Sequence, residues 1–374
     1  MTEITAITMP KWGLTMTEGK VLGWLKREGD EFRAGEELLE IETTKITNVF
    51  EASEDGRLRR IVAAAGATLP VGALLAVAAP DSIADSEIEA FVAGFAAPEP
   101  AAETGEEAAV AARDLEAGGR RLRVLELGAG EGAPIVFVHG FGGDLNSWMF
   151  NQPALSERHR TVALDLPGHG GAVKEVGAGD ADAFAAVVAD ALTALGLERV
   201  HLVGHSMGGA IALALAAQRP ASVASLTLIA GAGLGPEING AFIDAFVRAG
   251  RRREAQEALA MLVHDPALVS RAMVEETLRY KRLDGVGAAL AAMARAWFPD
   301  GRQALDLRPA LTALPMLPVQ VVWGREDRII PMAHAEALAQ RLPVHLLDEV
   351  GHLPHMEKAG EVNRLLAGFV AANP

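Results

Sequence analysis

The chain of 374 residues contains no cysteine, and its basic side chains are far outnumbered by acidic ones. The missing cysteines exclude disulfides, thiolate metal sites and a cysteine nucleophile. With 34 Lys and Arg against 49 Asp and Glu, the formal net charge is −15. Nucleic-acid binding needs a basic surface, so this charge argues against a nucleic-acid partner. We therefore expect neither a metal site nor a bound nucleic acid.

Signals for export and for membrane insertion are also missing. The first residues, M-T-E-I-T-A-I-T-M-P, lack the basic segment and apolar core of a secretory signal. The apolar runs, such as residues 210–217, are too short and too interrupted to span a bilayer. Half of all residues are nevertheless apolar, which is enough for two or three globular cores. These features predict a cytoplasmic protein that has no membrane partner.

The pattern of apolar runs divides the chain into three regions. Residues 1–80 contain short runs separated by glycine-rich turns, which predicts a small, all-β flattened barrel of two sheets. Residues 81–118 are rich in Ala, Pro and Glu, which predicts a flexible, extended linker. From 119 to 374 strand and helix signals alternate, which predicts a doubly wound, mostly parallel α/β sheet. Helical signals replace the strands over about 234–305 and predict an inserted cap.

One part of the linker has the pattern of a helix. Ile88, Phe91, Val92 and Phe95 follow one another at spacings that place them on one helical face. Such a short amphipathic helix either docks on its own chain or serves as a peptide that binds a partner. We favour docking on its own chain.

A serine in the second half of the chain has the surroundings of a catalytic nucleophile. The segment V-H-L-V-G-H-S-M-G-G places Ser206 between a strand-like and a helix-like apolar run. In a G-x-S-x-G elbow the flanking residues must be small because chain segments cross closely there. Gly204 and Gly208 meet that requirement, so the segment predicts a nucleophilic serine.

A serine nucleophile needs a base and an acid that orients the base. The expected order along the chain is serine, acid, histidine. We predict Asp327, in a loop after a strand, as the acid and His352, directly after the last apolar strand, as the base. Glu326 and His355 are competing candidates. Three further histidines lie in glycine-rich turns, where we expect only local hydrogen bonds: His139, His169 and His205.

The negative charge that develops on the substrate oxygen requires backbone amides as donors. We predict the amides of Met207, directly after the nucleophile, and of Phe141, in the early loop V-H-G-F-G-G-D. Together these residues resemble the α/β-hydrolase superfamily over about residues 120–374. The resemblance implies the fold and the catalytic machinery, but it does not define the substrate.

A lysine near the N-terminus has an equally specific environment. E-I-E-T-T-K-I-T-N-V-F-E places Lys45 at the tip of a predicted β-hairpin. The segment around it resembles a lipoyl domain, and the resemblance implies that Lys45 carries covalent lipoate. The matching elements are Met9-Pro10, Glu18-Gly19, Trp24-Leu25, Glu28-Gly29-Asp30, Gly35 and Glu42 through Lys45. Biotin carriers have methionines beside the lysine, whereas Thr44 and Ile46 stand here; the usual lipoyl pattern has Asp where Thr44 stands.

A lipoyl domain fused to an α/β-hydrolase domain resembles the dihydrolipoyllysine acetyltransferase component of acetoin dehydrogenase complexes. The usual acyltransferase motif H-x-x-x-D-G and a subunit-binding domain are both missing from the sequence. The resemblance implies transfer of an acetyl group from lipoyl-lysine to CoA at the serine site. It also implies a homo-oligomer that works with a thiamine-diphosphate-dependent dehydrogenase component, dihydrolipoamide dehydrogenase and a lipoate-attaching enzyme.

Two basic clusters in the predicted cap are candidates for binding the phosphates of CoA, for which arginine is well suited. They consist of Arg248, Arg251, Arg252 and Arg253, and of Arg279, Lys281 and Arg282. An ordinary solvated helix face explains them equally well. At the level of the whole chain, two alternatives stay open: a hydrolase with an accessory lipoyl domain, and a lipoyl carrier whose hydrolase fold is a scaffold. The parent substrate could also be another ketol, diketone or 2-oxo acid.

Overall fold

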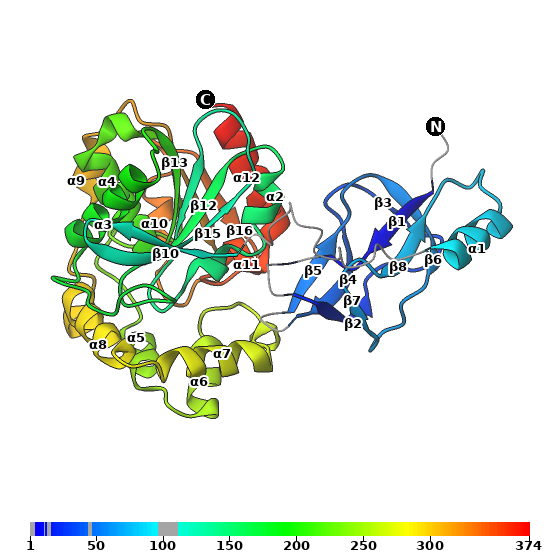
Figure 1. Cartoon of the computed structure of the whole chain (residues 1–374), viewed down its shortest axis with the longest axis horizontal. Coiled ribbons are helices and arrows are strands. Elements are labelled where there is room, and N and C mark those ends of the chain that lie inside the picture. Colours follow the sequence, from blue (N-terminus) through cyan, green and yellow to red (C-terminus); the bar gives the residue numbers. More distant parts are fainter. Residues whose placement is uncertain (1–3, 11, 13–15, 44–46, 96–110) are drawn as a thin grey trace. The chain divides into compact units, whose positions relative to one another are not determined.

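The computed structural model describes residues 4–10, 12, 16–43, 47–95 and 111–374. The chain falls into two compact units (Figure 1). The first is formed by the part up to residue 109, and the second by most of the part from Val110 onward. Among the described residues, no helix is long and apolar enough to cross a membrane.

The first unit is a flattened barrel of two four-stranded antiparallel sheets with the strand orders β1-β8-β6-β3 and β5-β4-β2-β7. Alternate side chains of β2 are buried and exposed, because only one face of each sheet meets the core. Val21, Ile41 and Leu58 lie at the centre of that core with no accessible surface. The strands are β1 (Thr5–Thr8), β2 (Glu18–Trp24), β3 (Glu31–Phe32), β4 (Glu37–Glu42), β5 (Thr47–Glu51), β6 (Gly56–Ile61), β7 (Thr68–Pro70) and β8 (Leu74–Ala78).

A helix after the barrel packs on the barrel itself. Helix α1 (Asp85–Gly94) buries Ile88 against Leu74 and Val77 of β8, and Phe91 joins the same cluster. Arg59 of β6 adds an ion pair with Asp85, with 2.7 Å between Nη2 and Oδ1. The apolar face predicted from the sequence therefore docks on its own chain.

The second unit contains an eight-stranded sheet with the order β16-β15-β14-β13-β11-β12-β10-β9. Its strands are β9 (Arg113–Ala117), β10 (Arg120–Leu127), β11 (Ile135–Val138), β12 (Thr161–Asp165), β13 (Val200–His205), β14 (Val223–Ile229), β15 (Val319–Gly324) and β16 (Val344–Leu347). The neighbouring strands β16, β15, β14, β13, β11 and β12 run parallel to one another. Strand β10 pairs antiparallel with both β12 and β9.

Strand β9 lies inside the region predicted as linker, so that prediction is wrong for residues 113–117. Leu115 and Ala117 are buried, and the strand pairs with β10 through a tight glycine turn. The sequence R-D-L-E-A offers only these two apolar positions, so the strand is stabilised by pairing rather than by an apolar run. Residues 96–110 lie outside the described part of the chain.

Helices cover both faces of this sheet (Figure 1). Helices α3 (Ala181–Ala194) and α4 (Met207–Gln218) lie on one face, and α2 (Gln152–Ser156) and α12 (Ala359–Ala371) on the other. Strands β12 to β15 are consequently buried throughout. The region predicted as a cap contains α5 (Gly240–Arg248), α6 (Arg252–Leu259), α7 (Arg271–Lys281) and α8 (Val286–Trp297). Short helices α9 (Arg308–Thr312), α10 (Ala333–Glu336) and α11 (Pro354–Glu357) complete the unit.

Candidate active site

Ser206 occupies the sharp turn between the end of β13 and the start of α4. Its backbone has φ 52° and ψ −118°, a conformation that costs free energy for any residue with a side chain. The turn is held by backbone bonds: the Ser206 amide donates to Ile229 O at 2.9 Å, and its carbonyl accepts from the Ala232 amide at 2.9 Å. This strained and well-anchored geometry is that of a nucleophile elbow.

The glycines around the elbow are required by close packing of backbone. A Cβ atom added at Gly204 would lie 2.4 Å from the carbonyl oxygen of Gly208. One added at Gly208 would lie 2.1 Å from that of Val138. A Cβ at Gly140, in the loop after β11, would lie 3.1 Å from the Cβ of Ser206. The loop after β11 is thereby placed directly beside the serine.

The structure brings Asp327 and His352 together. Asp327 Oδ2 lies 2.8 Å from His352 Nδ1, and both side chains are almost inaccessible to solvent. The second carboxylate oxygen, Oδ1, accepts the backbone amides of Ile329 and Ile330 at 2.8 and 3.0 Å. These bonds fix the carboxylate and favour the histidine tautomer whose Nδ1 carries the proton and whose Nε2 can act as a base.

The competing candidates have other roles in the structure. Glu326 turns its Oε2 to the amide of Val350, 3.0 Å away, and so supports the loop before His352. His355 is fully buried in α11, and neither of its ring nitrogens has a hydrogen-bond partner among the described residues. Burial lowers the pKa of His355 to about 3. Of the four candidates, only Asp327 and His352 form a charge-stabilised pair.

The loop after β11 is shaped by two histidines. The Gly142 amide donates to His169 Nε2 at 3.1 Å, and Gly143 closes a turn by donating to Gly140 O at 3.1 Å. His139 Nδ1 lies 2.8 Å from the same Gly140 oxygen. The amides of Gly142 and Gly143, the two residues after Phe141, are therefore both taken up by hydrogen bonds that hold the turn. Met207, the second predicted donor, is the first residue of α4, where helical amides have no acceptor within the helix.

The prediction of purely local bonds for the three turn histidines is incomplete. His139 and His169 each contact a nearby carbonyl through Nδ1, but each also accepts a distant amide at Nε2: His139 from Leu166, and His169 from Gly142. Burial lowers the pKa of both, so they stay neutral and keep an acceptor nitrogen. For His205 the prediction is wrong, because its Nε2 contacts the carbonyl of His352, 2.8 Å away.

Glu357 is a residue of the site region that the sequence analysis missed. Its carboxylate accepts the amides of Gly351 and Leu353, on either side of His352, and that of His264 at the base of the cap. Burial raises its pKa. In the sequence, the acidic residue shortly after His352 was the one sign of such a role. Only the fold shows that its carboxylate reaches the amides beside His352.

The cap arginines are largely engaged by neighbouring acids. Arg248 pairs with Asp244 in α5, Arg253 with Glu257 in α6, and Arg279 with Glu276 in α7. Arg252 lies 4.0 Å from Glu275, and Arg251 and Arg282 are exposed. Such exposed pairs are weak and exchange readily for a phosphate.

Lys281 differs from these arginines because it is tied to the backbone. Its Nζ donates to the carbonyls of Phe246 and Val247 at the C-terminus of α5. It also lies 5.2 Å from the centre of the Phe246 ring. Burial lowers the pKa of this amine. Lys281 therefore holds two cap helices together, a role that the prediction of a phosphate contact did not foresee.

Lys45 lies outside the described residues, but its flanks are defined. Strands β4 and β5, on either side of it, pair in antiparallel register with Glu42 opposite Thr47. A short hairpin connection suits a residue that has to reach other proteins. The flanking structure therefore fits a lipoyl attachment site.

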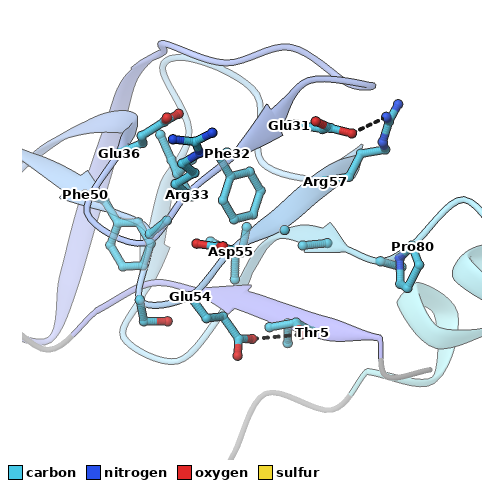
Figure 2. A pocket seen from close by; sticks show the side chains of 18 of the residues that line it. Thr5, Glu31, Phe32, Arg33, Glu36, Phe50, Glu54, Asp55, Arg57 and Pro80 are labelled. Atoms are coloured by element: carbon cyan, nitrogen blue, oxygen red, sulfur yellow. Dashed lines mark hydrogen bonds and ion pairs between the residues drawn. The ribbon is translucent and has the colours of Figure 1, made fainter. Parts of the chain in front are cut away.

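A groove of about 1020 Å³ is lined by residues of the first unit (Figure 2). Phe32 and Phe50 line it, together with charged residues that mostly have partners. Arg57 binds Glu31 at 2.6 Å, and Glu54 accepts from the hydroxyl of Thr5 at 3.1 Å.

Among the described residues, no group of three or more acidic or histidine side chains could hold a metal ion.

Comparisons with known proteins agree with this architecture. The family model described as alpha/beta hydrolase fold matches residues 133–359, and that described as biotin-requiring enzyme matches residues 5–77. A solved meta-cleavage product hydrolase of Pseudomonas fluorescens has a TM-score of 0.63 at 23% identity, covering 70% of this chain and 98% of that one. At that identity the likeness shows the fold alone.

Two curated proteins are similar over almost the whole length. The dihydrolipoyllysine-residue acetyltransferase component of the acetoin cleaving system of Pseudomonas putida is 48% identical and covers 99% of both chains. The protein of the same description from Cupriavidus necator is 44% identical, covering 97% of this chain and 96% of that one.

The two domain matches and the two relatives, at 48% and 44% identity, define an acyltransferase of α/β-hydrolase fold that carries a lipoyl domain. The chain belongs to the family of dihydrolipoyllysine-residue acetyltransferase components of acetoin cleaving systems. Its cofactor is covalently bound lipoate.

Proposed function

We propose that the chain transfers an acetyl group from lipoylated Lys45 to CoA through a covalent acetyl-Ser206. The observation that carries this proposal is the buried Asp327–His352 pair beside the strained elbow. When bound, the lipoyl group supplies the acetyl group as a thioester. Lys45, which follows β4 and precedes β5 in the sequence, is the attachment position.

His352 Nε2 takes the proton of the Ser206 hydroxyl while the serine oxygen attacks the thioester carbonyl. The amides of Phe141 and Met207 donate to the oxyanion. As the carbonyl re-forms, the C–S bond breaks, and the thiolate that leaves takes the proton from His352. His352 then accepts the proton of the CoA thiol, whose sulfur attacks acetyl-Ser206. The proton returns to the serine oxygen, which yields acetyl-CoA and the free enzyme.

The cap provides candidate groups for CoA phosphates. Arg251, Arg252 and Arg282 are exposed on cap elements and can turn to a phosphate without leaving a buried acid unpaired. Arg248, Arg253 and Arg279 would have to exchange an exposed partner on the same helix, at small cost. We no longer assign Lys281 this role, since its amine holds the end of α5.

The similar proteins are described as components of acetoin cleaving systems, so this chain works with other components. We propose a thiamine-diphosphate-dependent dehydrogenase as the enzyme that acetylates the lipoyl group and dihydrolipoamide dehydrogenase as the enzyme that reoxidises it. A lipoate-attaching enzyme modifies Lys45. We also propose that the chain forms a homo-oligomer in the cytoplasm.

The test is incubation of the purified chain with acetyl-dihydrolipoamide, with and without CoA. We expect acetyl-CoA with CoA, little free acetate without it, and loss of about 10⁴-fold or more in rate for Ser206→Ala. Ser222→Ala, at the half-buried end of the short 3₁₀ helix Pro220–Ser222 after α4, is a matched serine control that should keep its rate. Undiminished acetyl-CoA formation by Ser206→Ala would contradict the covalent route. Release of acetate at the same rate with or without CoA would instead identify a thioesterase.

A further inference from the structure

His205, the residue directly before the nucleophile, contacts the backbone of the predicted base. Its Nε2 lies 2.8 Å from the carbonyl oxygen of His352, and the two rings are 4.9 Å apart. We propose that His205 is a positioning residue that holds His352 at the correct place for proton transfer with Ser206. The inference rests on the proposed function, because it concerns the same triad.

The ring of His205 contacts all three parts of the site. It is covalently adjacent to Ser206, it binds the loop of His352, and its Nδ1 lies against Gly140. A Cβ atom added at Gly140 would lie 2.9 Å from that nitrogen, so the loop that carries Phe141 packs directly on the ring. One side chain therefore sets the spacing between nucleophile, base and oxyanion loop.

The hydrogen bond has a fixed direction. A carbonyl oxygen can only accept, so Nε2 of His205 must carry a proton and donate it. Burial lowers the pKa of His205 well below its usual value, and the neighbouring His355 and His352 lower it further. His205 thus stays neutral while His352 gains its proton during the reaction, and no second positive charge develops beside it.

A stack of rings limits the movement of His205. His355 packs behind it at 4.5 Å between ring centres, and Trp148 packs behind His355 at 4.6 Å. All three rings are buried. The His205 ring is therefore held within a buried group of rings, and its hydrogen bond to the carbonyl requires no reordering when substrate arrives.

Other contacts hold the same loop but do not replace this one. The amide of His352 donates to Leu262 O at 2.7 Å, and Glu357 binds the amides on either side. These bonds keep the loop folded when His205 is changed. The carbonyl of His352 is then free to rotate, and a small displacement of a base is enough to lower kcat by about 10- to 100-fold.

The decisive variants are His205→Met, which keeps the volume and removes the donor, and His205→Gln, whose side-chain NH₂ reaches to about the position of Nε2. The control is His201→Met on the same strand, β13. His201 is also buried, and its Nδ1 lies 2.8 Å from the hydroxyl of Ser225. The His201→Met variant therefore loses a comparable hydrogen bond, but one that lies away from the triad.

The assays use the full chain, with p-nitrophenyl acetate turnover and the rate of Ser206 labelling by a fluorophosphonate as readouts. Both are measured below the Tm of every variant. We expect His205→Met to lose about 10- to 100-fold in kcat and in labelling rate with little change in KM. His205→Gln should recover most of that loss, and His201→Met should keep both rates.

Unchanged rates in His205→Met would overturn the inference, as would a loss that His205→Gln does not recover or that His201→Met shares. Failure of the wild-type chain to be labelled at Ser206 would contradict the proposed triad and the inference together. Labelling of the wild-type chain with normal rates in His205→Met would contradict the inference alone.

Discussion

The two domains of this chain differ in what surrounds their predicted functional residues. In the lipoyl domain, the strands on either side of Lys45 pair with each other, with Glu42 opposite Thr47. In the hydrolase domain, Ser206 and His352 are only 7% and 2% exposed. A carrier has to present its lysine to several enzymes, whereas a nucleophile and base must exclude water and keep a fixed geometry.

The difference extends to how each site is assembled. The lipoyl site is local in the sequence, because Lys45 lies between β4 and β5, which pair with each other. The serine site combines loops after β11, β13, β15 and β16, which parallel pairing brings to the same edge of the sheet. Changes at the first site should therefore affect delivery alone, and changes at the second should affect chemistry alone.

The largest expected effect is that of Lys45→Arg. It replaces the one lysine that the sequence has between β4 and β5, so mass spectrometry should show no lipoyl adduct. Acetyl-CoA formation by the reconstituted complex should fall to background, while transfer from free acetyl-dihydrolipoamide continues at the wild-type rate. Lys20→Arg, at an exposed position of β2, is the control and should keep both. Equal loss of transfer from the free substrate would break the separation between delivery and chemistry.

Asp327→Asn should have the next largest effect. The amide keeps the bonds from Ile329 and Ile330 but presents NH₂ to His352, which favours the wrong histidine tautomer. We expect kcat to fall about 10⁴-fold with an unchanged Tm. Glu326→Gln is the neighbouring control and should keep most of its activity. The reverse ranking of the two variants, measured with acetyl-dihydrolipoamide and CoA, would reassign the acid.

A smaller effect is expected when the docked helix of the lipoyl domain is weakened. Ile88→Ala removes the side chain that α1 buries against β8, and should lower the free energy of unfolding of this domain by about 2–4 kcal/mol. Hydrogen–deuterium exchange of the β8 amides reports on this domain separately from the other. Glu89→Ala, on the exposed side of α1, should leave exchange unchanged. Equal protection in both variants would mean that α1 contributes nothing to the domain.

The smallest effect is a pH dependence in the hydrolase domain. The pKa of His355 is about 3 in the fold, below its usual value, so its contribution to stability is lost as pH falls from about 6.5 toward 3. His355→Phe keeps a ring against Trp148 and cannot be protonated. Between pH 8 and pH 5, the free energy of unfolding of the wild type should fall by about 2 kcal/mol more than that of His355→Phe. Urea titrations of both proteins at both pH values test this. An equal change in the free energy of unfolding of the two proteins would contradict it.

Patterns in the sequence predicted most elements of the fold because their causes are local. The runs around β13 and the helix after it are largely apolar, since both elements are almost entirely buried. The spacing of Ile88, Phe91 and Val92 predicted α1 for the same reason. Strand β9 was missed because it has only two buried side chains and depends on pairing with β10.

The sequence by itself determined the two domain types, the place of Lys45 between two strands that pair and that of Ser206 between strand and helix, because each depends on neighbours within a few residues. Only the tertiary structure showed that Asp327 contacts His352 whereas Glu326 binds the amide of Val350, since both acids have suitable chemistry. It also turned His205, Glu357 and Lys281 toward distant backbone groups. Those directions follow from how separate segments pack, and no local pattern encodes them.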